Sequence, residues 1–147
     1  MKRGIVGILF TLMTMSLVAQ EKYIEKREEM IKLSEQVVED FMKNDAPSGF
    51  DKLLPYWPLP ENEILSLEEK TVKYLNIIKD RFGDPYGFVK VKTEKIGDFA
   101  IRDTYMVQYD FNAIRVIFTY YKNPKGWIVN AFKWDDTFKE EFVIVEE

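Results

Sequence analysis

The side chains of this chain that could do chemistry are carboxylates and tyrosines, because the sequence contains no histidine and no cysteine. Serine–histidine and cysteine–histidine nucleophilic sites cannot be assembled without those residues, and neither can the usual zinc sites. Carboxylates could still hold a hard cation, but no D-x-D-x-D-G calcium loop occurs in the sequence. We therefore expect no cofactor and no metal site.

Two polar residues, Asp103 and Asn130, are predicted to lie on the buried side of a β-sheet. Alternation along the strands 99–110 and 127–135 places both on the same side as large apolar residues. A buried polar group costs about 1–3 kcal/mol unless it is paired, so each of the two needs a partner or a role. Three tyrosines on the same side bring hydroxyl groups with them: Tyr105, Tyr109 and Tyr120.

The elements that must position these side chains follow from hydrophobic periodicity. Apolar residues at helical spacing predict a helix over 23–42. The breaker-rich stretch "NDAPSG" at 44–49 is expected to end it. A second helix over 66–82 begins with a capping box, in which Ser66 and Glu69 each bond the backbone N–H of the other.

After the second helix the period becomes alternating, which predicts strands. Four are expected, at 87–95, 99–110, 113–122 and 127–135. The turns between them are short and rich in glycine, so consecutive strands should be antiparallel neighbours. The sequence therefore predicts an α+β fold with two N-terminal helices packed on a curled four-stranded antiparallel sheet.

The N-terminus has the layout of a secretory signal peptide. Lys2 and Arg3 precede an apolar run that carries no charge before Glu21. We expect residues 1–20 to be cleaved, leaving one exported domain, periplasmic or secreted, over 21–147 with no membrane span. An uncleaved anchor is the alternative, but the run is short for a bilayer span and contains hydroxyl residues. With 21 Lys and Arg against 25 Asp and Glu, the chain offers no basic stripe for nucleic acid.

The order of helices and meander, with "RFGDPYGF" at 81–88 and "KGWIVNAFKW" at 125–134, resembles the cystatin-like cone fold of the nuclear transport factor two superfamily. The chain looks most like small exported bacterial members of unknown function, over about residues 22–135. It departs from the usual plan in showing no clear third helix, unless the 46–62 segment supplies a short one. The superfamily hosts enzymes, ligand binders and interaction modules, so the resemblance implies a fold more than a function.

The resemblance implies that a pocket opens between helices and sheet. Steroid isomerases of the superfamily use a pocket carboxylate with tyrosine donors, which would make Asp103 a general base with a raised pKa and Tyr105 or Tyr120 an oxyanion donor. The plainer alternative is structural. A β-bulge would turn Asp103 to solvent beside Arg102, and Asn130 would bond a tyrosine hydroxyl or a backbone group.

The apolar stretch "DKLLPYWPLPENE" at 51–63 resembles a polyproline ligand, but it is too apolar to lie open between two helices. We expect it to be a lid across the mouth of the cone. The leading hypothesis is non-enzymatic binding of a small apolar or aromatic ligand, or of a protein partner. The predicted pocket residues are Trp57, Tyr105, Tyr109, Tyr120, Asn130 and Trp134.

Two other functions remain open. A cofactor-free isomerase or dehydratase would use Asp103 as its general base. A homodimeric interaction module would use the reverse face of the sheet, through Met106, Ile117, Trp127 and Val129. The final segment, 136–147, is expected to be an additional edge strand or a tail, and the alternation of Phe142 and Ile144 favours a strand.

Overall fold

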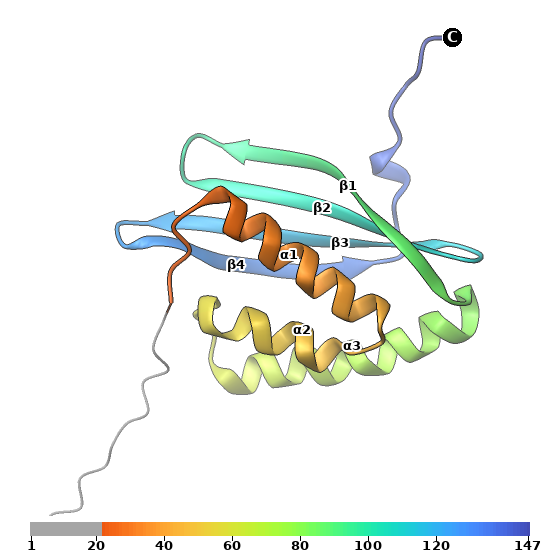
Figure 1. The fold of residues 1–147 in the computed structure, drawn as a ribbon, viewed down its shortest axis with the longest axis horizontal. Coiled ribbons are helices and arrows are strands. Elements are labelled where there is room, and N and C mark those ends of the chain that lie inside the picture. Colours follow the sequence, from red (N-terminus) through yellow and green to blue (C-terminus); the bar gives the residue numbers. More distant parts are fainter. Residues whose placement is uncertain (1–21) are drawn as a thin grey trace, which may run out of the picture.

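Three α-helices lie on one face of a four-stranded antiparallel sheet in the computed structural model, which describes residues 22–147 (Figure 1). The predicted signal peptide and its cleavage point lie outside the described residues. No helix within the described part is both long and apolar enough to cross a membrane. The elements are α1 (Arg27–Met42), α2 (Ala46–Leu53), η1 (Leu54–Tyr56), α3 (Glu61–Phe82), β1 (Pro85–Ile96), β2 (Ala100–Tyr109), β3 (Ala113–Asn123), β4 (Gly126–Asp135) and η2 (Lys139–Glu141).

The first helix, α1, begins four residues later than the hydrophobic pattern predicts. Its N-terminus is set by Glu29, whose carboxylate accepts hydrogen bonds from the backbone N–H groups of Glu25 and Lys26, at 3.1 and 3.3 Å. Residues 22–26 are therefore left outside the helix. The buried residues of α1 recur at helical spacing: Met30, Leu33, Ser34, Val37, Val38 and Phe41, with Asp40 also buried beside them.

Residues 22–147 form three α-helices where two were predicted, because the segment expected to end the first helix begins α2 instead. α2 lies in the 46–62 segment, where a short additional helix was left open. Asp45 is the N-cap of α2, and its carboxylate accepts from the backbone N–H of Ser48 at 3.3 Å and from its hydroxyl at 2.7 Å. Pro47 lies in the first turn, where a missing N–H costs nothing. The same Asp, Pro and Ser that break one helix thus start the next.

The long helix α3 begins five residues before its predicted start at Ser66. It starts directly after Pro60, so Ser66 and Glu69 lie inside the helix and do not form its capping box. The helix ends at Gly83, as the sequence predicts. Gly83 has a φ of 85°, and a Cβ there would stand 2.5 Å from a carboxylate oxygen of Asp110, so only glycine fits this position without a shift.

The four predicted strands are confirmed to within about two residues, and they form the meander β1-β2-β3-β4. The register of β2 on β3 is regular from Ala100↔Tyr121 to Gln108↔Ala113. Irregularities occur on both outer strands: in β1 between Lys90 and Lys92, and in the β3–β4 pairing at Thr119/Tyr120. Side chains therefore alternate regularly between the two faces where β2 pairs with β3, and the alternation is interrupted in the pairings of β1 and β4.

The irregularity at β4 overturns the predicted burial of Asn130. Thr119 pairs with Ala131 while Tyr120 pairs with Val129, which leaves Asn130 as the extra residue of a bulge. One inserted residue exchanges the two faces of a strand. Val129 therefore lies in the core, and Asn130 is exposed to solvent.

The core between helices and sheet is filled with aromatic rings that meet edge to face. The Phe132 ring is 5.5 Å from Phe41, 5.6 Å from Phe50 and 6.3 Å from Trp57. Trp57 and Leu53 are buried, so the proline-rich stretch that contains them packs on the core. This placement excludes an open ligand motif and makes the stretch part of the core.

The reverse face of the sheet is crossed by a C-terminal strap, residues 136–141 (Figure 1). The Glu141 carboxylate bonds Lys92 of β1 at 2.8 Å and Arg115 of β3 at 2.9 Å, so the strap spans β2. Met106 and Ile117, assigned above to a dimer surface, are buried on this face. Residues 136–147 form no strand; apart from η2 they are irregular.

Candidate functional site

The predicted catalytic residue, Asp103, lies at the centre of β2 and has no solvent-exposed surface. Its carboxylate is fully engaged. Arg27 of α1 donates to both oxygens at 2.6 Å in a bidentate pair, and the Thr93 hydroxyl donates to Oδ1 at 2.6 Å. Lys90 lies 3.7 Å away. The predicted inward direction of Asp103 is correct, and the alternative in which a bulge turns it to solvent is wrong.

The electrostatics of this cluster oppose the predicted role of Asp103. Burial alone raises the pKa of Asp103, but the hydrogen bonds from Arg27 and Thr93 and the charges of Arg27 and Lys90 outweigh it. The pKa is held below its ordinary value, whereas the general-base hypothesis requires a raised one. A carboxylate with a depressed pKa and every oxygen bonded is a poor proton acceptor near neutral pH.

The three predicted tyrosines are core residues, and burial raises the pKa of each. The Tyr120 hydroxyl is 2.6 Å from Ser34 Oγ and donates to the Met30 carbonyl at 3.1 Å. The Tyr105 hydroxyl is buried, and it makes no hydrogen bond of ordinary geometry within residues 22–147, although Ser34 is near enough to lower its pKa slightly against the effect of burial. Tyr109 packs its ring against Phe82 at 6.3 Å, and burial raises its pKa to about 12.

The residues predicted to form a ligand pocket therefore do not meet around a common cavity. Trp57, Tyr105 and Tyr120 are closed in by other rings of the core. Asn130 is on the surface. Trp134 is half-buried at the end of β4, where its indole N–H donates to the Thr71 hydroxyl of α3 at 3.3 Å. These groups specify and stabilise the fold.

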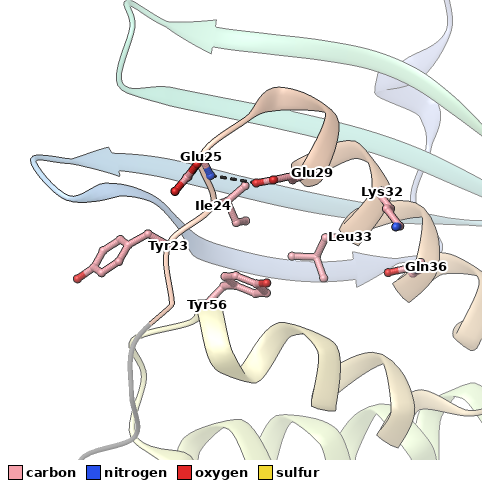
Figure 2. A pocket seen from close by; sticks show the side chains of 8 residues that line it. All are labelled: Tyr23, Ile24, Glu25, Glu29, Lys32, Leu33, Gln36 and Tyr56. Atoms are coloured by element: carbon pink, nitrogen blue, oxygen red, sulfur yellow. Dashed lines mark hydrogen bonds between the residues drawn. The ribbon is translucent and has the colours of Figure 1, made fainter.

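A different cleft opens where residues 22–26 pass between α1 and η1 (Figure 2). Its volume is about 580 Å³. Eight residues line it: Tyr23, Ile24, Glu25, Glu29, Lys32, Leu33, Gln36 and Tyr56. Leu33 and the Tyr56 ring lie close together near its middle in the close-up view, with Glu25 and Glu29 on one side and Lys32 and Gln36 on another (Figure 2).

The wall formed by residues 22–26 is fixed by backbone pairing. Ile24 and Trp127 exchange two backbone hydrogen bonds at 2.8 and 3.0 Å, and the N–H of Lys22 donates to the Pro55 carbonyl at 2.8 Å. Gly126 makes the close approach feasible, because a Cβ there would stand 2.9 Å from Tyr23 Cβ. The backbone bonds to β4 and η1 therefore hold this wall of the cleft in place.

The exposed surface of the cleft is more polar than apolar, and its apolar floor is small. Ile24 and Leu33 are buried at its base, and Tyr56 presents a half-buried ring. Glu29 is committed to capping α1, whereas Lys32 is exposed and makes no ion pair within residues 22–147. No group of three or more Asp or Glu side chains in that same range is placed to hold a metal ion.

Sequence reasoning missed this cleft because its residues seemed to belong to a helix. Tyr23 and Ile24 continue the apolar spacing of α1, so they were assigned to its buried face. The helix begins at Arg27 instead, and its N-cap is Lys26, which belongs to a residue type with no capping preference. The one signal of a helix start here is Glu29 at the third helical position, where a capping box has its acid.

Comparison of the sequence with protein-family models, with curated proteins and with solved structures gives no match.

Proposed function

We propose that this domain is an exported, non-enzymatic binding module whose ligand site is the cleft between residues 22–26, α1 and η1. The single observation that carries the proposal is the cleft itself. Its volume of about 580 Å³ falls within the range of about 300–1,000 Å³ typical of small-molecule sites. Its apolar floor and half-buried tyrosine ring are the surfaces that such sites use to bury a ligand.

The polar groups around the floor favour a ligand of one chemical class. Lys32 is the one cation among the eight lining residues and has no carboxylate partner among residues 22–147, so a ligand anion would supply one. Glu25 and Glu29 lie on another side of the cleft, so the anion has to lie at the Lys32 end (Figure 2). Gln36 lies one helical turn further along the same face and can donate to the same group. The matching ligand is a small aromatic or apolar molecule that carries a carboxylate. Its ring would lie on Leu33 and Tyr56.

The state of Asp103 argues for binding over catalysis. The isomerase or dehydratase hypothesis needs an inward carboxylate that can accept a proton, and Asp103 is instead bound by Arg27 and Thr93. The ligand cleft is lined by neither Asp103 nor Tyr105. Binding therefore has more support in this chain than catalysis.

We also propose that the fold is of the cystatin-like cone type found in the nuclear transport factor two superfamily. Helices that precede an antiparallel meander, packed on one of its faces, support this assignment. α2 provides the additional helix that the sequence pattern lacked. The N-terminal charge and apolar run support export.

A titration with 2-naphthoate, a bicyclic aromatic carboxylate, tests the proposed site. Two-dimensional ¹H–¹⁵N NMR of residues 21–147 should show shifts confined to residues 22–26, η1 and α1 as far as Gln36. Lys32→Glu and Tyr56→Ala should each weaken binding by about tenfold, which is the loss of one polar or ring contact. Tyr74→Ala on α3 is the matched control, because Tyr74 is an exposed tyrosine outside the cleft.

The outcome of that titration separates the alternatives. Shifts that spread over the sheet, or binding unchanged by both cleft substitutions, would place the ligand elsewhere. Absence of any shift with naphthoate and with its uncharged amide would contradict the small-ligand proposal. Binding of the amide but not of the naphthoate would mean that Lys32 does not contribute to binding and that the apolar floor does.

A further inference from the structure

The residues that follow the strap form a run of four exposed apolar side chains. Phe142, Val143, Ile144 and Val145 are 76, 81, 98 and 75% exposed. Single exposed apolar residues are ordinary, but a contiguous run of them marks an interaction surface or an aggregation hazard. β-branched and aromatic residues favour extended structure, and Phe142 already has extended backbone angles, φ −68° and ψ 136°.

A matching acceptor is the outer edge of β1. The described sheet has two edge strands, β1 and β4. The edge of β4 is partly capped by the backbone pairing of Ile24 with Trp127, whereas β1 is a twelve-residue strand for which no such outer pairing occurs within residues 22–147. Val89 and Val91 are 48 and 38% exposed along it. An uncovered edge of this length is a template for another strand.

Charge complementarity links the donor segment to this edge. The apolar run is flanked by acids on both sides, in the sequence "EEFVIVEE" at 140–147. β1 carries Lys90, Lys92 and Lys95. One such contact already exists within the chain, because Glu141 bonds Lys92 at 2.8 Å. Lysines also protect edge strands from unspecific pairing, so an acidic partner strand is the one this edge admits.

The path of the chain shows which copy receives the segment. The contact of Glu141 with Lys92 brings the chain to the β1 side of the sheet. From there the C-terminal residues run away from the sheet, beyond β1 (Figure 1). The high exposure of residues 142–145 agrees with that path, because the run touches almost nothing of its own domain. A strand leaving the molecule at its open edge can reach the same edge of a second copy.

We propose that this chain forms a homodimer by reciprocal strand addition, in which residues 142–145 of each copy pair with the β1 edge of the other. The arrangement is two-fold symmetric, since each copy is donor and acceptor once. Backbone hydrogen bonds would provide the affinity, as in other strand-addition complexes. The apolar run is covered and both open edges are closed, while the strap stays bound to its own sheet.

Sedimentation equilibrium of residues 21–147 tests the proposal against a chain that ends at Glu141. The longer chain should be a dimer. The shorter chain should dimerise at least about tenfold more weakly and keep the same circular dichroism spectrum. Ile144→Lys should act like the truncation. Leu65→Lys is the control, because it places the same charge on an exposed apolar residue of α3, outside both the tail and β1.

Cysteine pairing then identifies the contact, since the chain has no cysteine of its own. Mixtures of Val89→Cys protein with Val143→Cys or Ile144→Cys protein should give a disulfide between unlike chains for one of the two tail positions, which project to opposite sides of a strand. A monomer at about 100 μM would overturn the proposal, because so weak an association lies outside that of specific dimers. A dimer that survives truncation would also overturn the proposal. So would disulfides formed only between two Val89→Cys chains, or a disulfide formed within one chain that carries both cysteines.

Discussion

Arg27, in the first turn of α1, binds both carboxylate oxygens of Asp103 in the middle of β2, and the two residues are separated by 76 positions of sequence. The pair ties the helical layer to the sheet at one point. It also explains why a fully buried carboxylate is tolerated in an aromatic core, since a charge taken out of water must be matched by a partner of opposite charge.

The first prediction concerns loss of the arginine. Arg27→Met should lower the free energy of unfolding by about 3–5 kcal/mol, because it leaves the charge of Asp103 buried with only Thr93 and a more distant Lys90 as partners. Urea unfolding followed by circular dichroism measures the change. The Arg27→Met/Asp103→Leu double variant should recover much of the loss, because it removes the orphaned charge.

A surface ion pair on the same sheet provides the control. Arg102 donates to Glu94 at 2.7 Å, but both side chains are substantially exposed. Arg102→Met should therefore cost less than about 1 kcal/mol. Equal losses for the Arg27 and Arg102 variants would contradict the view that the Arg27–Asp103 pair owes its importance to burial.

The second prediction follows from the depressed pKa of Asp103. Burial opposes ionisation, but Arg27 and Thr93 together lower the pKa below the ordinary value of 3.8. The folded state therefore binds its proton at lower pH than the unfolded state. The resulting stabilisation is complete above the unfolded-state pKa, and it is lost as the pH falls through the folded-state value.

Unfolding free energies measured between neutral pH and the acid limb should show this loss in the wild type. Asp103→Asn should flatten that part of the profile, although it lowers stability at pH 7 by leaving Arg27 without its carboxylate. A profile that stays as steep in the Asn variant would assign the acid limb to other carboxylates, such as Glu94, whose pKa is lowered by its hydrogen bond from Arg102.

The sequence was most informative where structure depends on neighbours in the chain. The four strands could be predicted because alternation is a local property of the sequence. The end of α3 could be predicted for the same reason, because glycine's tolerance of a positive φ is also local. The α+β class followed from these elements. The third helix was left open and not predicted, because Asp45 and Pro47 serve equally well to stop one helix and to start another.

The site depended on contacts that no local pattern encodes. Alternation placed Asp103 inward, but its partner lies on another element, and that partner reverses the direction of its pKa shift. A single bulge moved Asn130 to the surface, and nothing in the letters 127–135 marks the inserted residue. The strap was not foreseen because its anchor is one carboxylate, Glu141, that meets two distant strands.

The third prediction contrasts two buried tyrosine hydroxyls. Tyr120→Phe should destabilise the fold by about 1–3 kcal/mol, because it leaves Ser34 Oγ and the Met30 carbonyl buried without the partner that joins them. Tyr105→Phe should be neutral or stabilising, because its hydroxyl makes no hydrogen bond of ordinary geometry within residues 22–147. Thermal unfolding of the two variants provides the comparison, since both remove one oxygen from a fully buried ring. A large loss for Tyr105→Phe would instead indicate a buried water bonded to that hydroxyl.

The fourth prediction concerns the strap, whose release should expose Met106. Glu141 contacts Lys92 and Arg115 with its side chain almost fully buried, so Glu141→Ala removes both anchors at once. The thioether of Met106 should then be oxidised by dilute hydrogen peroxide several times faster than in the wild type, as followed by mass spectrometry of the fragment that contains it.

Two internal references make the oxidation experiment decisive. Met30 lies on the buried face of α1, so its oxidation should stay slow in every variant that remains folded. Glu140→Ala removes a neighbouring acid that is largely exposed and lies 3.5 Å from Arg115, so it should leave the strap in place. Equal acceleration at Met30 and Met106 would mean general unfolding. An unchanged rate at Met106 would mean that Arg115 and Asp135, which pair at 2.9 Å, hold the face closed without the strap.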